Sequence, residues 1–271
     1  MLELLFLLIL AGIISVFLWY QSFQEFTILQ IDYQPSIEIP TEKNPIVLRG
    51  IPREFLGFWR SGNATQSSLP VLYDGGRRRT TLKEFVSQLA KGDAPIWDPL
   101  SATELATRFN LHSRFQDTMM FLTRWSHLPV RSIFAPAALW CLGKGQTLGL
   151  QRSLAERTVL TVHEGKAIVW LARETISVKE IQTILGRNPW ALSVFSYPFI
   201  NELQYVEVVL RTGTTLLLPP RSLYAIRSES DMSYVSSVEL HSPLSFFINS
   251  LSIPLQRPKI QESIVKHATQ S

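Results

Sequence analysis

The first feature of the hydrophobic pattern is an uncharged run at the N-terminus. Residues 4–24 carry no charged side chain, and the run opens at Leu4. A helix rises 1.5 Å per residue, so this run spans roughly 30 Å, the thickness of the hydrocarbon core of a bilayer. Trp19 and Tyr20 lie where interfacial aromatic side chains are expected. The pattern predicts a single transmembrane anchor over residues 1–24.

A cleaved signal peptide and a buried core helix are the alternatives for this run. No Lys or Arg precedes it, and no small-x-small cleavage motif follows it. The run also exceeds the apolar core of a signal peptide, which is roughly 7–15 residues long. These observations favour an uncleaved anchor.

Beyond the run, the pattern becomes proline-containing and then strand-like. Residues 25–43 are predicted to be a linker, within which Phe26–Ile31 alternates as a short extended piece. Residues 44–52 read NPIVLRGIP, which is typical of a buried strand that ends at Gly-Ile-Pro. We expect one folded domain over residues 44–253 and a polar C-terminal tail over residues 254–271.

Three segments have the apolar spacing of helices. The segment that follows Thr81 carries Glu84 three residues later, and this Thr-x-x-Glu pattern predicts a capping box at the start of an amphipathic helix. Residues 101–128 are predicted to be helical, beginning at Ser101. A short helix is predicted over residues 178–185.

From residue 145 the pattern changes to alternation and short apolar runs, which predict strands. A tight turn at Gly165 separates the first two of them. The predicted strands cover residues 158–163, 167–172, 205–210, 214–218, 224–228 and 232–240. Helices first and short strands afterwards predict an α+β fold, in which an antiparallel barrel or double sheet follows a helical preface.

Composition limits the chemistry. Cys141 is the single cysteine, which excludes an intramolecular disulfide and a cysteine-rich zinc site. Residues 1–42 hold five of the 22 acids and no base, so the 26 basic residues lie beyond them against 17 acids. Arg77–Arg79 is the strongest basic cluster, and its place after Gly-Gly predicts a solvated turn, with contact to an acidic partner or a lipid headgroup as the alternative. No nucleic-acid-binding motif accompanies it, so we expect no nucleic-acid partner.

Three stretches in the right order resemble the cupin-like JmjC family, which includes the asparaginyl-hydroxylase-type oxygenases. Residues 44–50 resemble that family's first strand, x-P-V-V-[IL]-R-G. Residues 158–171 resemble its strand, G-x-K turn and strand. Residues 213–226 follow the form G-D-x-L-x-[IV]-P-x-x-W-W-H-x-[IV]. The resemblance implies a double-stranded β-helix barrel with flanking helices.

The same resemblance implies where a site would lie. The family binds Fe(II) with two His and one carboxylate, and these positions correspond here to Arg152, Leu154 and Tyr224. The family's 2-oxoglutarate lysine corresponds to Ala167, and Lys166 is one residue away, on the opposite face of a strand. Arginine and leucine offer no lone pair to iron. The chain is therefore interpreted as a degenerate member without a metal site or cofactor.

These patterns lead to a functional hypothesis with two alternatives. We expect a non-catalytic, membrane-anchored accessory subunit, whose partners are membrane lipid and the other protein subunits of a membrane assembly. A mitochondrial inner membrane, an endomembrane or a viral membrane would suit it. The alternatives are an Fe(II)/2-oxoglutarate hydroxylase with atypical ligands and a module that binds a small anion at Arg152. If the pocket is plugged instead, we expect Arg152 to pair with Glu156 or Glu207, with Arg221 near the rim.

Overall fold

A computed structural model of the chain describes residues 10, 27–33, 44–50, 68–73, 76–91, 96, 98–109 and 136–241. Among these described residues, no helix is both long enough and apolar enough to cross a membrane. The predicted anchor, including Leu4, Trp19 and Tyr20, lies outside the described residues apart from residue 10. The predicted polar tail of residues 254–271 also lies outside them.

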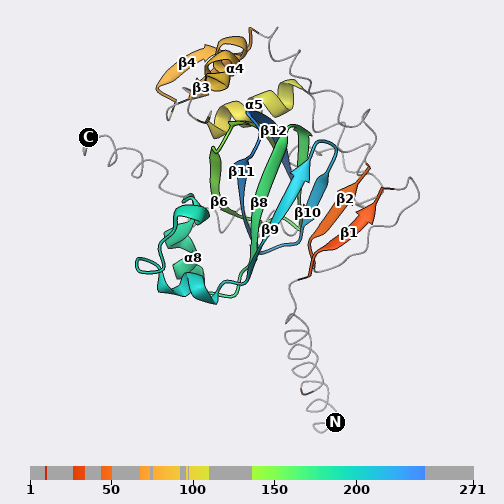
Figure 1. The fold of residues 1–271 in the computed structure, drawn as a ribbon, viewed down its shortest axis with the longest axis vertical. Helices are drawn as coiled ribbons and strands as arrows, with labels where there is room; N and C mark the ends of the chain where they lie inside the picture. The colour runs from red at the N-terminus through yellow and green to blue at the C-terminus, as the bar shows by residue number, and fades with distance from the viewer. Residues whose placement is uncertain are drawn as a thin grey trace, which may run out of the picture.

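The described residues form a barrel of two facing antiparallel sheets (Figure 1). One sheet contains the order β10-β7-β12-β5, and the other has the order β6-β11-β8-β9. The strands are β5 (Ala137–Gly143), β6 (Thr147–Arg152), β7 (Arg157–Glu164), β8 (Lys166–Arg173), β9 (Tyr205–Arg211), β10 (Thr215–Leu218), β11 (Ser222–Ser228) and β12 (Met232–Leu240). Most successive strands change sheet, which is the jelly-roll arrangement of cupins. The predicted cupin-like barrel is confirmed, in a mostly β structure with few described helices.

Two short strands extend the larger sheet beyond β10. β2 (Ile46–Arg49) pairs with β10, and β1 (Leu29–Asp32) pairs with β2 in parallel. β2 confirms the strand predicted over residues 44–52. β1 lies within the predicted linker, and its alternating side chains are half-buried because they pack at the edge of this sheet.

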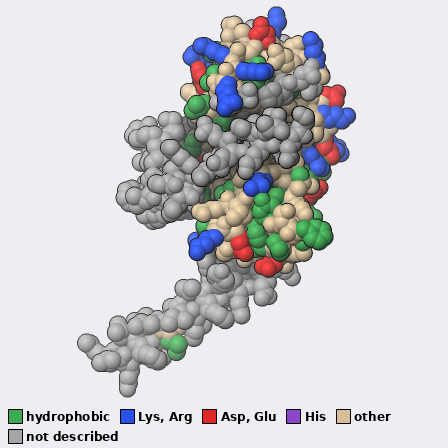
Figure 2. All heavy atoms as spheres, turned by 90° about the vertical axis from the view of Figure 1, so that its left-hand side faces the viewer, with side chains coloured by type: hydrophobic (Ala, Val, Ile, Leu, Met, Phe, Trp, Pro, Cys, Tyr) green, Lys and Arg blue, Asp and Glu red, His purple; other side chains and the backbone are tan. Residues whose placement is uncertain are grey.

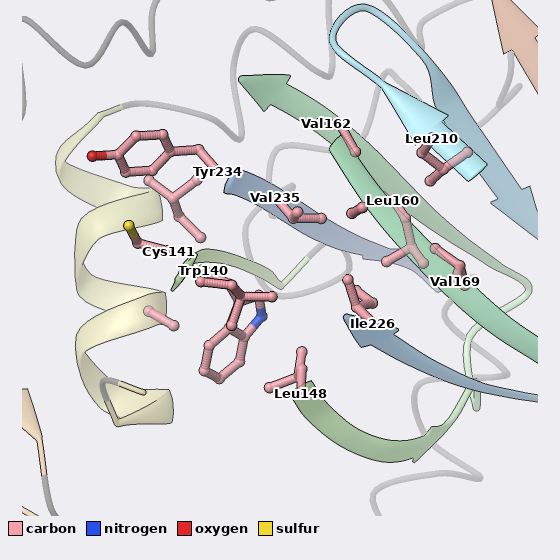
Figure 3. Packing of buried hydrophobic residues seen from close by; sticks show 14 of the residues in the cluster. Trp140, Cys141, Leu148, Leu160, Val162, Val169, Leu210, Ile226, Tyr234 and Val235 are labelled. Carbon is pink, nitrogen blue, oxygen red and sulfur yellow. The ribbon is translucent and has the colours of Figure 1, made fainter. Parts of the chain in front are cut away.

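The space between the two sheets is filled by apolar side chains (Figure 3). β7 and β8 contribute Leu160, Val162 and Val169, and the adjoining strands add Trp140 and Ile226. The strands that line this space read as nearly continuous apolar runs because their other faces are covered too. The barrel interior is therefore a packed core.

Two helices cover the outer face of β5. α4 (Leu82–Ala90) begins with the predicted capping box, in which Thr81 and Glu84 exchange side-chain-to-backbone hydrogen bonds. α5 (Pro99–Arg108) packs against β5, and Figure 3 shows Cys141 and Tyr234 directed toward it. The helix predicted to begin at Ser101 begins two residues earlier, because Pro99 has a backbone dihedral suited to the first helical turn. The described part ends at Arg108, and residues 110–128 lie outside it.

A small antiparallel ribbon precedes α4. It consists of β3 (Pro70–Tyr73) and β4 (Arg78–Thr81). The predicted solvated turn at Arg77–Arg79 is right in its exposure, but Arg78 and Arg79 belong to β4. Their partners across the ribbon are Tyr73 and Leu72.

An insert of residues 174–204 connects β8 to β9 and covers the outer face of the smaller sheet. It contains α8 (Val178–Ile184), η1 (Pro189–Ala191) and η2 (Pro198–Glu202). Its apolar side chains, including Ile181 and Ile184, form a second core with Trp170 and Leu223. α8 confirms the short helix predicted over residues 178–185.

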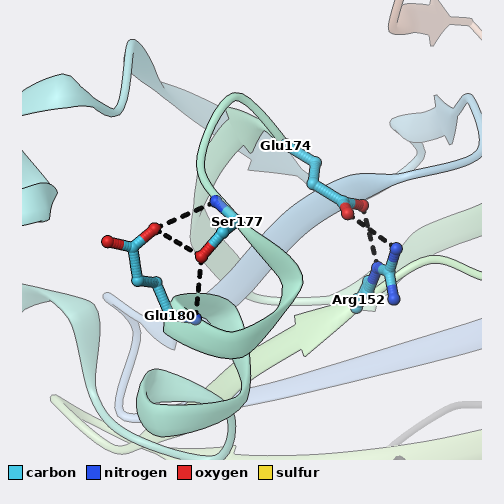
Figure 4. Close-up of polar contacts among 4 residues, drawn as sticks. All are labelled: Arg152, Glu174, Ser177 and Glu180. Carbon is cyan, nitrogen blue, oxygen red and sulfur yellow. Dashed lines mark hydrogen bonds and ion pairs between the residues drawn. The ribbon is translucent and has the colours of Figure 1, made fainter.

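Removing the cap of α8 is expected to destabilise the insert. The Ser177 hydroxyl accepts from the Glu180 backbone N–H, and the Glu180 carboxylate accepts from the Ser177 backbone N–H (Figure 4). Because Ser177→Ala removes the first of these bonds, we expect the free energy of unfolding to fall by about 1 kcal/mol. Urea unfolding of the full chain in mild detergent measures it. The exposed Ser196 supplies the control, since Ser196→Ala should change it by less than about 0.5 kcal/mol; equal effects would contradict a capping role.

Candidate functional site

The residues that correspond to the family's metal ligands lie at one end of the barrel. β6 finishes at this end with Arg152, β8 finishes with Arg173, and β11 begins with Ser222. Ser222 is the register partner of Arg173, and Leu223 is the partner of Arg152. We name this the Arg152 end. The opposite Gly165 end carries the tight turns at Gly145, Gly165 and Gly213.

Tyr224 is the third residue of β11, and its side chain points into the barrel. It belongs to the inter-sheet core and is only 2% exposed. Its register partner on β8 is Leu171, which is fully buried in the same core. Burial raises the pKa of the Tyr224 phenol, and the negative charge of Glu239 raises it further. Tyr224 is therefore a neutral phenol packed in an apolar site.

Arg152 lies on the opposite face of the same sheet. It is paired with Leu223, and directly paired residues of two strands share a face. Leu223 belongs to the second core, beneath the insert, whereas its neighbour Tyr224 belongs to the inter-sheet core. The register of β6 against β11 shifts between Tyr224 and Ile226. This bulge turns the last residues of β6, so the side chain of Arg152 leaves the barrel interior.

The guanidinium of Arg152 is held by Glu174, the first residue of the insert (Figure 4). Its Nε donates to Oε2 at 2.9 Å and its Nη2 donates to Oε1 at 2.7 Å. The two side chains are 11% and 9% exposed. A paired carboxylate was predicted for Arg152, but the predicted partners are wrong: Glu156 is exposed, and Glu207 accepts from Trp190 Nε1 at 2.6 Å.

The other predicted site residues lie apart from Tyr224. Lys166 begins β8 at the Gly165 end, where it forms an ion pair with Glu229. Ala167 faces the core instead, so the predicted opposite orientation of these neighbours is confirmed. Leu154 follows β6 and is half-buried. Arg221 is exposed beside the Arg152 end, and its backbone N–H donates to the Ser153 carbonyl.

Polar groups that the sequence pattern did not indicate occupy the Arg152 end. Arg173 Nη2 donates to Asn44 Oδ1 at 3.2 Å, and Asn44 Nδ2 donates to Thr27 Oγ1 at 3.1 Å. Glu239 lies near enough to Tyr224 to affect its pKa, and its Oε2 is 3.3 Å from His241 Nε2. Because β12 returns to this end from the far side of the barrel, only the strand register could have revealed these neighbours.

The donors present do not fit the family's Fe(II) site. The guanidinium of Arg152 has no lone pair to offer a metal ion, and it faces away from Tyr224. Its Nε and Nη2 groups donate hydrogen bonds to the carboxylate of Glu174. Leu154 has no donor atom. Among the described residues, no group of three His, Cys, Asp or Glu side chains is placed to hold a metal ion. Therefore, no oxidation step through a bound metal can be derived at these positions.

Alkaline pH is expected to destabilise the fold through Tyr224. The fold holds this phenol protonated because burial raises its pKa, whereas the unfolded chain releases the proton near pH 10. Above that pH the folded state binds more protons than the unfolded state, so its stability falls by about 1.4 kcal/mol per pH unit for each such group. We expect Tyr224→Phe to flatten this decline by that amount, in urea unfolding measured between pH 9 and about 11.5. An unchanged slope would contradict the burial of the phenol.

Comparisons with known proteins assign the chain to no family. No family model matches the chain, and no curated protein matches it. Among solved structures, 716 chains match, including the Drosophila melanogaster CENP-C cupin domain. That match has 13% identity and a TM-score of 0.27, and it covers 38% of this chain and 59% of that domain. The strand order of the barrel, and not a score of this size, defines the fold.

Proposed function

We propose that the chain is a non-catalytic, membrane-anchored accessory subunit of a larger membrane assembly, built on a degenerate JmjC-like barrel. The observation that carries the proposal is that none of the three positions corresponding to the family's metal ligands holds a side chain placed to bind iron. Tyr224 is packed as a neutral phenol, Leu154 offers no donor, and Arg152 faces outward into an ion pair. The barrel interior is filled by its own side chains and not by a ligand site, which supports a scaffold role.

The anchor of this proposed subunit is the predicted span over residues 1–24. Its partners are membrane lipid and other protein subunits, and a mitochondrial inner membrane, an endomembrane or a viral membrane would suit it. The anion-binding alternative is weaker, because both guanidinium contacts of Arg152 go to Glu174 within the chain. An anion would have to displace a charge-assisted, bidentate partner that is nearly buried.

Metal analysis tests the non-catalytic part of the proposal. Full-length protein purified in mild detergent should contain no stoichiometric iron, and its 2-oxoglutarate turnover should equal the background because the donor set is wrong for Fe(II). Stoichiometric iron, with turnover that Tyr224→Phe abolishes and Tyr205→Phe preserves, would overturn it. Tyr205 is the matched control because its side chain is 57% exposed.

Native electrophoresis tests the assembly part. In mild-detergent extracts of its source membrane, the chain should migrate in a complex much larger than its own mass of 30.9 kDa. Migration as a single free chain would contradict membership of an assembly. Resistance to extraction by alkaline carbonate is expected if residues 4–24 span the bilayer.

A further inference from the structure

The insert of residues 174–204 displays apolar side chains to solvent. Phe195 is 98% exposed and Tyr205, beside the insert on β9, is 57% exposed. Val178 and Val194 are exposed as well. Figure 2 shows hydrophobic side chains gathered on the lower part of the face that carries the insert. Exposed patches of this kind mark surfaces that bind a protein or a membrane.

Phe195 is held outward by a structured turn. The backbone N–H of Phe195 donates to Ser193 Oγ at 3.2 Å, and the N–H groups of Ser196 and Tyr197 donate to the Ser193 carbonyl at 3.1 and 3.0 Å. The turn is continuous with the second core through Tyr197, which packs against it. The exposed ring is thus presented on a fixed base.

Ring contacts and a hydrogen bond attach the residues on either side of this turn to the smaller sheet and to each other. Arg227 lies over the Trp190 ring at 4.5 Å, and Trp190 Nε1 donates to Glu207. Arg187 lies over the Tyr197 ring at 5.3 Å. These contacts hold the insert on the outer face of the smaller sheet.

The insert begins at the place where the predicted anchor would reach the barrel. Thr27 is bound to Asn44, and Asn44 is bound to Arg173, whose next residue opens the insert. Figure 1 shows α8 and the starts of β1 and β2 at one end of the barrel, with α4 at the other. The predicted span ends at residue 24, and three extended residues reach at most roughly 11 Å. In the proposed anchored subunit, Thr27 would therefore lie within about that distance of the bilayer surface.

We propose that the insert docks on the surface of the same bilayer, with Phe195 and Val194 entering the interfacial region. In the anchored subunit a short tether would hold the Arg152 end of the barrel near the membrane, and α8 of the insert lies at that end (Figure 1). Aromatic side chains are favoured at the interface between headgroups and acyl chains. The charges of residues 174–204 are three acids and two bases, so docking relies on apolar contact and does not need anionic lipid. The inference rests on the proposed anchor.

Fluorescence quenching in phosphatidylcholine nanodiscs tests the docking. The full chain carries Phe195→Cys, labelled with an environment-sensitive fluorophore, and the matched variant carries Lys144→Cys at the Gly165 end. The Lys144 side chain is 73% exposed. The native Cys141 is fully buried, and burial raises the pKa of its thiol, so wild-type protein should take up no label.

The label at residue 195 should lose most of its fluorescence to nitroxide-bearing lipid and little to aqueous iodide, and the label at residue 144 should behave in the opposite way. Quenching of residue 195 by iodide as strongly as residue 144 would overturn the docking. Shielding of residue 195 from both quenchers would also overturn it, because a protein would then cover the patch. Carbonate-resistant flotation with liposomes reports on the anchor separately, so loss of docking alone leaves the proposed function standing.

Discussion

Gly149→Ala is expected to lower the free energy of unfolding by about 3 kcal/mol, because a side chain at this position would collide with backbone. A Cβ built on Gly149 lies 2.1 Å from the carbonyl oxygen of Gly186 and 2.5 Å from its carbonyl carbon. Neither atom belongs to a flexible side chain, so the clash can be relieved only by moving the two segments apart. The expected loss is large because that movement breaks further contacts.

Those contacts join the edge of β6 to the end of α8. Leu150 donates its N–H to the Arg187 carbonyl at 2.7 Å, and Gly186 donates to the Leu150 carbonyl at 2.8 Å. The close approach therefore pairs the open edge of the smaller sheet with the insert. Alanine at residue 149 would loosen this pairing and the second core that it closes.

Gly145→Ala is the matched control for this prediction. Gly145 has a φ of +76°, and no heavy atom lies within 4 Å of its Cβ position. The substitution adds only the penalty of a left-handed conformation, about 1 kcal/mol. Urea unfolding of both variants measures the difference. Equal losses would show that the backbone of β6 does not approach Gly186 as described.

Local patterns in the sequence predicted the elements whose causes are local. The capping boxes at Thr81 and Ser177 need only residues three apart, and the first of them was predicted as such. The opposite faces of Lys166 and Ala167 follow from the alternation of a regular strand. The barrel architecture was predicted from the family resemblance, whereas the order of its strands was not predicted, because no local pattern specifies which strands pair.

The position of Arg152 could not be predicted in the same way. Counting residues from Gly165 placed Arg152 in one pocket with Tyr224, but no strand was predicted over residues 147–152, so the face on which its side chain lies could not be read from the sequence. The bulge near Gly149 breaks the alternation and turns the side chain outward. Its partner Glu174 lies 22 residues away and is brought to it by the pairing of β6 and β8 with β11. Such a partner depends on tertiary register, which the spacing of charges along the chain does not encode.

The Arg152–Glu174 pair gives the second large effect. Arg152→Ala is expected to lower the free energy of unfolding by about 3 kcal/mol, because it leaves the carboxylate of Glu174 nearly buried without its cation. Two short hydrogen bonds, at 2.9 and 2.7 Å, would be lost together. Urea unfolding at neutral pH measures the change. The Lys144–Asp231 pair is the control, since its side chains are 73% and 93% exposed; Lys144→Ala should cost less than about 0.5 kcal/mol.

A double variant separates the value of the pair from the cost of breaking it. In Arg152→Met/Glu174→Leu no buried charge is left alone, and apolar side chains face the second core, so stability should return to within about 1 kcal/mol of wild type. The same variant also tests the anionic-ligand alternative, because it removes the guanidinium that would bind the anion. If the assembly is unchanged in native electrophoresis, the result agrees with a scaffold in which Arg152 acts only within the fold. A loss of stability as large as in Arg152→Ala would contradict this view, because the charges themselves would then be needed at this end of the barrel.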